Sequence, residues 1–198
     1  MKPFNPKPRP CAHCGSKFTP VRPMQSVCSP ICAARKVKAD KAQERAKIVT
    51  RKEAIKTIPQ LIREAQVEFN AYIRARDSGK PCICCGRSEA GGYGLSSHGW
   101  DCGHYRSTGS ASHLRFNEDN AHRQLVVCNR HGAGRAVDYR IGLIERIGLA
   151  RVEALESSNT PHKWTAEELR SIKTTYREKT KQLLKDVVWK SFDQKRAG

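Results

Sequence analysis

The clearest pattern in the sequence is an apolar residue at every third or fourth position between residues 58 and 73. This spacing predicts an amphipathic helix over residues 59–77 with one buried stripe. Pro59 suits the first turn of such a helix, and Gly79 followed by Pro81 suits its end. The expected stripe consists of Ile58, Ile62, Ala65, Phe69, Tyr72 and Ile73.

Two further stretches with helical spacing lie in the C-terminal third of the chain. Residues 136–156 are expected to be helical, with an apolar stripe of Val137, Ile141, Ile144 and Leu149. Thr165 and Glu168 have the spacing of a capping box, which predicts the start of another helix. The residues that this helix is expected to bury are Leu169, Ile172, Tyr176 and Leu183.

The remaining segments differ in composition, which suggests four parts. Residues 1–10 are rich in Pro and Lys and predict a disordered basic arm, and residues 11–32 hold four cysteines. Residues 33–57 contain no Pro or Gly and many charges, which predicts a basic helical linker. Residues 58–198 form the main domain. Within it, residues 82–134 are rich in Cys, His, Gly and Asn and indicate loops and short strands around metal.

Composition adds that this chain of 198 residues has a thin core. Apolar residues make up 38% and aromatic residues 7%. Small domains with few apolar residues usually need metal ions or disulfides to be stable. The sequence shows no secretory signal and no run of 18 apolar residues, so we expect a cytoplasmic protein. Its nine cysteines therefore indicate metal binding before disulfides.

The formal net charge of +18 predicts a polyanionic partner, of which DNA is the common case. Residues 1–57 carry 14 basic and three acidic side chains, and residues 58–198 carry 23 and 16. An acidic membrane is the weaker interpretation, because the basic stretch has no bulky apolar anchors on an opposing face.

The first cysteine cluster has the spacing Cys11-x2-Cys14-x13-Cys28-x3-Cys32. Each close pair can present two thiolates to one tetrahedral ion, so the cluster predicts a four-cysteine zinc finger over residues 11–32. Four protein ligands leave no open position for chemistry. We therefore expect a structural zinc, in a module that contacts DNA together with the basic helix behind it.

The central region carries residue types that hydrolysis of a phosphodiester requires. Such a reaction needs a base that activates water and a divalent ion that neutralises developing charge. A neutral imidazole can be the base, and carboxylate and amide oxygens suit magnesium or manganese. His104, Asp101 and Asn129 provide one of each.

Several strings extend this observation to a known family. They are DCGHYRST (residues 101–108), LRFNEDNAH (residues 114–122) and VVCNRH (residues 126–131). With the N-terminal cysteines, FNAYIRARD (residues 69–77) and HKWT (residues 162–165), they resemble the NinG (Rap) recombination proteins of lambdoid phages and, more broadly, the HNH (ββα-metal) nucleases. The resemblance implies an α+β fold with a zinc-stapled ββα-metal core flanked by helices. It also implies a nuclease acting on D-loops and Holliday-type junctions, on phage or prophage DNA in the bacterial host.

The resemblance also implies roles for individual residues. His104 corresponds to the general base, and Asp101 and Asn129 correspond to ligands of the catalytic metal. Asn120 corresponds to the middle Asn of the motif, which fixes the loop of the catalytic constellation. A second, structural zinc is implied, with Cys82, Cys85 and Cys128 as ligands.

The chain departs from the family pattern at one zinc ligand. The family has Cys-x2-Cys before the final Asn, whereas this chain has Leu125-x2-Cys128. His131 is the first substitute, since Cys-x2-His is a workable knuckle. Cys84, Cys102 and His122 are alternatives, as is a water molecule. Of the arginines in this region, we expect one to clamp the scissile phosphate. They are Arg106, Arg115, Arg123 and Arg130.

Three functional hypotheses remain open from the sequence. The first is a metal-dependent endonuclease, and because symmetric cutting of a junction needs two active sites, it implies at least a transient homodimer. The second is a zinc-stabilised DNA-binding recombination accessory protein without catalysis, under which Asp101 and Asn129 have no purpose. The third is an assembly factor that holds other recombination proteins on DNA through its terminal helices.

Overall fold

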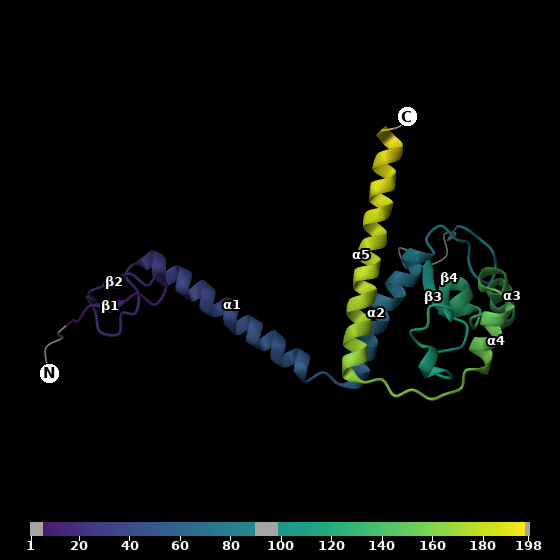
Figure 1. Ribbon diagram of the computed structural model, residues 1–198, viewed down its shortest axis with the longest axis horizontal. Helices are drawn as coiled ribbons and strands as arrows, with labels where there is room; N and C mark the ends of the chain where they lie inside the picture. Colours follow the sequence, from purple (N-terminus) through teal and green to yellow (C-terminus); the bar gives the residue numbers. More distant parts are fainter. Residues whose placement is uncertain (1–5, 90–98, 197–198) are drawn as a thin grey trace. The chain divides into compact units, whose positions relative to one another are not determined.

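The computed structural model describes residues 6–89 and 99–196, which form small two-stranded sheets and helices of mixed α+β type. The chain divides into two compact units, Met1–Lys56 and Thr57–Gly198. Figure 1 labels the elements of both units. No helix in the described ranges is long and apolar enough to cross a membrane.

The first unit is a small hairpin followed by a long helix. Strands β1 (Arg9–Pro10) and β2 (Lys17–Phe18) pair antiparallel, and α1 extends over Pro30–Ala54. Helix α1 begins where it does because the side chain of Ser29 accepts a hydrogen bond from the Cys32 amide at 3.2 Å. Cys32 is the only buried residue of α1, so this helix has no apolar face against its own unit.

The expected basic arm over residues 1–10 needs a correction at its C-terminal end. Arg9 and Pro10 form β1, because they pair with Phe18 and Lys17 across the turn that holds the first two cysteines. Residues 1–5 lie outside the described part of the chain.

The second unit is built around a pair of packed helices, α2 (Ile58–Arg76) and α5 (Ala166–Arg196), which lie side by side in Figure 1. Their interface is apolar at the centre and is flanked by ion pairs between Lys173 and Glu64 and between Arg177 and Glu68. The two helices share a buried apolar cluster with the hairpin described below. Its buried residues are Leu61, Ala65, Phe69, Ile73, Cys102, Phe116, Ala121, Leu169 and Tyr176. The helix expected for residues 59–77 is therefore confirmed, as is the burial of Ala65, Phe69 and Ile73. Ile62 and Tyr72 of the expected stripe are half-buried, Ile58 is exposed, and Leu61, which was not expected, is buried. The Thr165–Glu168 capping box is also formed.

A hairpin and two short helices complete the second unit. Strand β3 (Trp100–His104) pairs antiparallel with β4 (Ala121–Leu125), so that Asp101 lies opposite Gln124 and His104 opposite Ala121. The connecting loop contains the 3-10 turn η1 (Ser112–Leu114). After β4 come the π-helix η2 (Val127–His131), α3 (Ala136–Ile147) and α4 (Leu149–Ser157). The antiparallel strands β3 and β4 are thus followed by the helices η2 and α3.

Residues 136–156 are largely helical as expected, and Ile144 packs against a buried cluster, but the rest of the expected stripe is wrong. Gly148 has a φ of 87°, which an L side chain rarely adopts, and it separates α3 from α4. Val137 and Ile141 are 76% and 56% exposed. The buried residues of the two helices are Tyr139, Leu143, Val152 and Leu155, which pack with Ile83, Ala111 and Leu114.

Candidate metal centres and nuclease site

The first cysteine cluster brings all four predicted cysteines together. Their sulfur atoms lie within 4.8 Å of one another, with Cys14 and Cys28 at 3.6 Å and Cys28 and Cys32 at 3.5 Å. Sulfurs bound to one tetrahedral zinc at about 2.3 Å lie about 3.8 Å apart, so these residues fit the ion. The Cys14 amide lowers the pKa of Cys11 to about 6, which favours the thiolate that a metal requires.

The second cluster consists of Cys82, Cys84, Cys85 and Cys128, whose sulfur atoms also lie within 4.8 Å of one another. Cys82 and Cys84 are 3.6 Å apart, and the hydrogen bond from the Cys84 thiol lowers the pKa of Cys82 to about 4. Four thiols at this spacing fit a second tetrahedral zinc. Three of them, Cys82, Cys84 and Cys85, come from one turn of the chain.

The choice of His131 as the fourth ligand is corrected by this arrangement. His131 ends the π-helix η2 with an exposed side chain, whereas Cys128 of the same helix is buried. The two residues therefore do not form a knuckle around one point. Leu125 occupies the apolar side of the cluster, and its amide donates to the Cys82 sulfur at 3.3 Å.

The other two alternatives for the fourth ligand also lie elsewhere. Cys102 is buried in the cluster between α2 and α5, and burial raises its pKa to about 12. His122 is buried on β4, and burial lowers its pKa to about 3. Its Nδ1 has no hydrogen-bond partner within the described residues.

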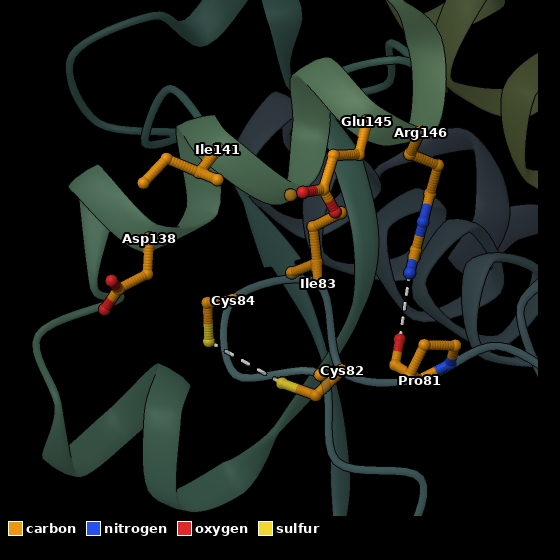
Figure 2. A pocket seen from close by; sticks show the side chains of 10 residues that line it. Pro81, Cys82, Ile83, Cys84, Asp138, Ile141, Glu145 and Arg146 are labelled. Atoms are coloured by element: carbon orange, nitrogen blue, oxygen red, sulfur yellow. Dashed lines mark hydrogen bonds between the residues drawn. The ribbon is translucent and has the colours of Figure 1, made fainter.

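Helix α3 supports the second cluster from one side (Figure 2). Arg146 donates to the carbonyl of Pro81 at 2.9 Å. Ile83, which lies between Cys82 and Cys84 in the sequence, points toward α3. A cavity of about 370 Å³ lies here, but Asp138 and Glu145 line it. Because these carboxylates repel phosphate, this cavity is a poor site for DNA.

A second cavity, of about 450 Å³, contains two of the predicted catalytic residues. His104 from the end of β3 and Asn129 from η2 both line it, together with Tyr105, Ser107 and Thr108. It therefore lies between the hairpin and the π-helix, and its polar lining can receive a polar substrate.

His104 is held in a defined orientation at this cavity. Its Nε2 lies 3.1 Å from the carbonyl oxygen of Arg115, and its ring lies 6.1 Å from that of Phe69. A carbonyl only accepts, so Nε2 carries the proton and Nδ1 keeps the lone pair of the neutral ring. Burial lowers the pKa of His104 below its ordinary value, although the Arg115 carbonyl opposes that effect.

Asp101 is joined to Asn129 but not to His104. The amide nitrogen of Asn129 lies 3.0 Å from Oδ2 of Asp101, and Arg130 donates to both carboxylate oxygens at 2.8 and 2.9 Å. Successive side chains of a strand point to opposite faces, so Asp101 and His104, three residues apart, leave β3 on different sides. Asn129 contacts one of them and shares a cavity with the other.

Asn120 holds the loop between β3 and β4. It is fully buried; its side-chain oxygen accepts from the Arg106 amide at 2.8 Å, and its nitrogen donates to the carbonyls of Arg106 and Leu114. The resemblance places it within the catalytic constellation, but a buried side chain with these bonds cannot touch a substrate. Asn120 is therefore a positioning residue for the loop.

A buried polar network that the sequence did not reveal lies behind the hairpin. Asp77 is fully buried and accepts from Arg76 at 2.9 and 3.0 Å and from the Arg123 amide at 3.2 Å. Although burial acts to raise it, these partners hold the pKa of Asp77 at about 2. The network ties the end of α2 to β4. Its only signal in the sequence is an Arg-Asp pair at a helix end, which is too common to be informative.

Comparison with known proteins gives one consistent result. The family profile described as "Bacteriophage Lambda NinG protein" matches residues 3–186. Protein ninG of Salmonella phage P22 is 42% identical, covering 86% of this chain and 90% of its own. Protein ninG of Escherichia phage lambda is 41% identical, covering 86% and 89%.

Protein ninG of Escherichia phage 933W is 47% identical over a shorter region, which covers 69% of this chain and 65% of its own. No solved structure matches the chain. The profile match and the coverage of the phage relatives together show that the chain belongs to the NinG family of bacteriophage proteins.

Proposed function

We propose that this protein is a metal-dependent endonuclease of the HNH type that acts on branched DNA intermediates of phage recombination. The observation that carries the proposal is His104: a half-buried, neutral imidazole with Nε2 bound to a main-chain carbonyl, at a cavity shared with Asn129. Such a ring can take a proton from water at Nδ1 near neutral pH. The order of two antiparallel strands followed by helix supports an HNH-like core.

The residues around Asp101 fit a magnesium or manganese ion. The Asp101 carboxylate and the Asn129 side-chain amide can both supply hard oxygen donors, the amide after it turns its oxygen toward Asp101 in place of the nitrogen that now bonds it, and both ions accept a few protein oxygens with water filling the rest. When bound, such an ion neutralises the charge that develops on the phosphate and on the leaving oxygen. The protein's own part is to hold His104 and Asn129 rigid across one cavity.

The decisive experiment is cleavage of an end-labelled four-way junction beside a matched linear duplex, with manganese or with EDTA. We expect manganese-dependent products from the junction with the wild-type protein and none with His104→Ala. His113→Ala is the matched control, because His113 is also half-buried and also bonds a main-chain carbonyl, that of Ser158 at 2.8 Å. It should cut normally. Zinc content and circular dichroism establish that His104→Ala is folded.

The pH dependence of cutting is a second readout of the same residue. His104 acts as a base only when it is neutral, and its pKa lies below the ordinary value of about 6.5. The acid limb of the rate should therefore have its midpoint below pH 6.5. An acid limb centred above 6.5, or full cutting by His104→Ala, would rule out His104 as the base.

A DNA-binding accessory protein without catalysis is the second candidate. It is favoured by the ion pair of Asp101 with Arg130, which neutralises the carboxylate, and by the exposed basic helix α1. Retention of junction DNA with no product from any variant, in manganese or magnesium, would support it over the nuclease.

A further inference from the structure

The four arginines of the nuclease region differ sharply in what they bind. Arg106 donates to the carbonyls of Leu155 and Ser158. Arg115 donates to the Thr108 carbonyl and to the side chain of Gln66. These main-chain bonds keep both guanidinium groups in structural roles.

Arg123 is engaged in the same way. It donates to the carbonyls of Asp77 and Ser78, and its guanidinium lies 3.6 Å from the centre of the Trp100 ring. Arg130 differs from the other three, because within the described residues its guanidinium bonds a carboxylate and no main-chain oxygen. Its side chain is 60% exposed, and its partner is Asp101.

The Arg130 guanidinium therefore occupies the place beside Asp101 that the proposed divalent ion would take. A guanidinium binds both oxygens of Asp101, the same oxygens that a divalent ion needs, and Asn129 donates to one of them. The Arg130 side chain is 60% exposed and that of Asp101 16%, so solvent reaches the guanidinium, and ion pairs open to solvent on one side are more easily exchanged than fully buried ones. A doubly charged ion and a guanidinium cannot bind one carboxylate together without strong repulsion.

We propose that Arg130 competes with the divalent ion for Asp101 and, once displaced, binds a phosphate of the DNA. The inference rests on the proposed nuclease function. DNA phosphate and metal ion then bind cooperatively, because phosphate withdraws Arg130 from the carboxylate and the ion releases Arg130 to the phosphate. The guanidinium suits both partners, since carboxylate and phosphate each accept it in bidentate geometry.

The first test measures manganese binding to the zinc-loaded full-length protein without DNA, from the electron paramagnetic resonance signal of free Mn²⁺. Arg130→Ala should bind manganese about fivefold more tightly than wild type, as expected for loss of a competing exposed ion pair. Asp101→Asn should lose the site, which locates it.

Arg151→Ala is the matched control for the change in charge. Arg151 also donates from two of its guanidinium nitrogens to a carboxylate, that of Asp119, and its side chain is 58% exposed. It should bind manganese like wild type. Equal manganese affinity in Arg130→Ala and wild type would overturn the competition.

The second test measures junction cutting at saturating manganese. Arg130→Ala should cut at least tenfold more slowly, because it lacks the phosphate contact, whereas Arg151→Ala should cut normally; one such contact is of the order of 1.4 kcal/mol. Normal cutting by Arg130→Ala would overturn the role at phosphate. If even wild type does not cut, the nuclease proposal fails, whereas tighter manganese binding by Arg130→Ala would still support the competition at Asp101.

Discussion

Cys84 and Leu125 have exchanged roles at the second cysteine cluster. Position 125, where the resemblance implies a cysteine, holds a leucine that is 1% exposed and packs with Cys82 and Cys128. Cys84 supplies the fourth sulfur from the other side of the cluster. The cluster thus keeps four thiols although one of them comes from a different place in the chain.

This exchange predicts the zinc content of two variants. Cys84→Ser should reduce the content from two zinc ions per chain to about one after mild chelation, because a three-thiolate site is weaker. The double variant Cys84→Ser/Leu125→Cys should restore two. The measurement is zinc per chain by atomic emission, together with the charge-transfer absorption of the cobalt-substituted protein, whose intensity follows the number of thiolates.

Cys102→Ala is the control for these variants, because Cys102 is buried but belongs to neither cluster. It should keep two zinc ions. Full zinc retention by Cys84→Ser under the chelation that strips one ion from Cys82→Ser would show that Cys84 is not a ligand.

At this scale, sequence spacing was sufficient where the geometry is local. Cys11, Cys14, Cys28 and Cys32 are predicted as a set and do lie together, because close cysteine pairs on tight turns converge by themselves. The choice between Cys84 and His131 depended on whether residues 127–131 wind as a π-helix, which exposes His131. Nothing in the local sequence specifies that winding. The pairing of Arg130 with Asp101 joins η2 to β3 and was equally inaccessible.

Helix α3 and the turn that holds Cys82 and Cys84 are in direct contact at the scale of elements. A Cβ atom at Gly142 would overlap the carbonyl oxygen of Ile83 and come close to its side chain. The glycine therefore lets the helix backbone approach the metal-binding turn more closely than any other residue would. The same contact brings Arg146 to the Pro81 carbonyl.

Gly142→Ala should consequently destabilise the protein. Alanine in place of glycine inside a helix normally stabilises by about 1 kcal/mol, but overpacking a close contact costs about 1–3 kcal/mol, so the overlap should prevail. We expect a lower urea midpoint and faster release of one zinc ion to a chelator. Gly79→Ala is the control, since nothing lies within 4 Å of its Cβ position, and its midpoint should hardly change. A raised midpoint in Gly142→Ala would contradict the close contact.

The elements themselves were partly predictable. The stripe of α2 was identified because α5 and the β3–β4 hairpin pack against its apolar side in one buried cluster, which gives a recognisable apolar row. The stripe over residues 136–156 failed because Gly148 breaks the helix and because the second cluster and the connecting loop cover Tyr139 and Leu143 instead. The exposed Val137 and Ile141 preserve helical spacing without burial.

On the scale of the whole molecule, charge and structure are divided differently between the two units. Helix α1 carries eight basic and three acidic residues and buries only Cys32, so its basic side chains are available to solvent. The second unit holds the cavity with His104 and has its own core of packed helices. The basic helix and the cavity with His104 thus lie in separate units of the chain.

A protein consisting of residues 57–198 should therefore fold, retain one zinc ion and bind DNA more weakly. Loss of the basic residues of α1 should reduce the slope of log affinity against log salt by about 3 or more, since each neutralised phosphate contributes about 0.9. The measurement is fluorescence anisotropy of a labelled junction from about 50 to about 200 mM salt, with zinc content as the check on folding. Identical slopes for the full and shortened chains would show that the first unit does not contact phosphates.

The position of Cys84 opposite Leu125 also bears on the ancestry of the metal centre. A ligand can move along a chain without an unbound intermediate if the new thiol arises before the old one disappears. In such an intermediate five thiols surround one ion, and the cysteine at either position 84 or position 125 can then be lost while four ligands remain. The genealogy of this family should accordingly include chains that carry cysteine at both positions.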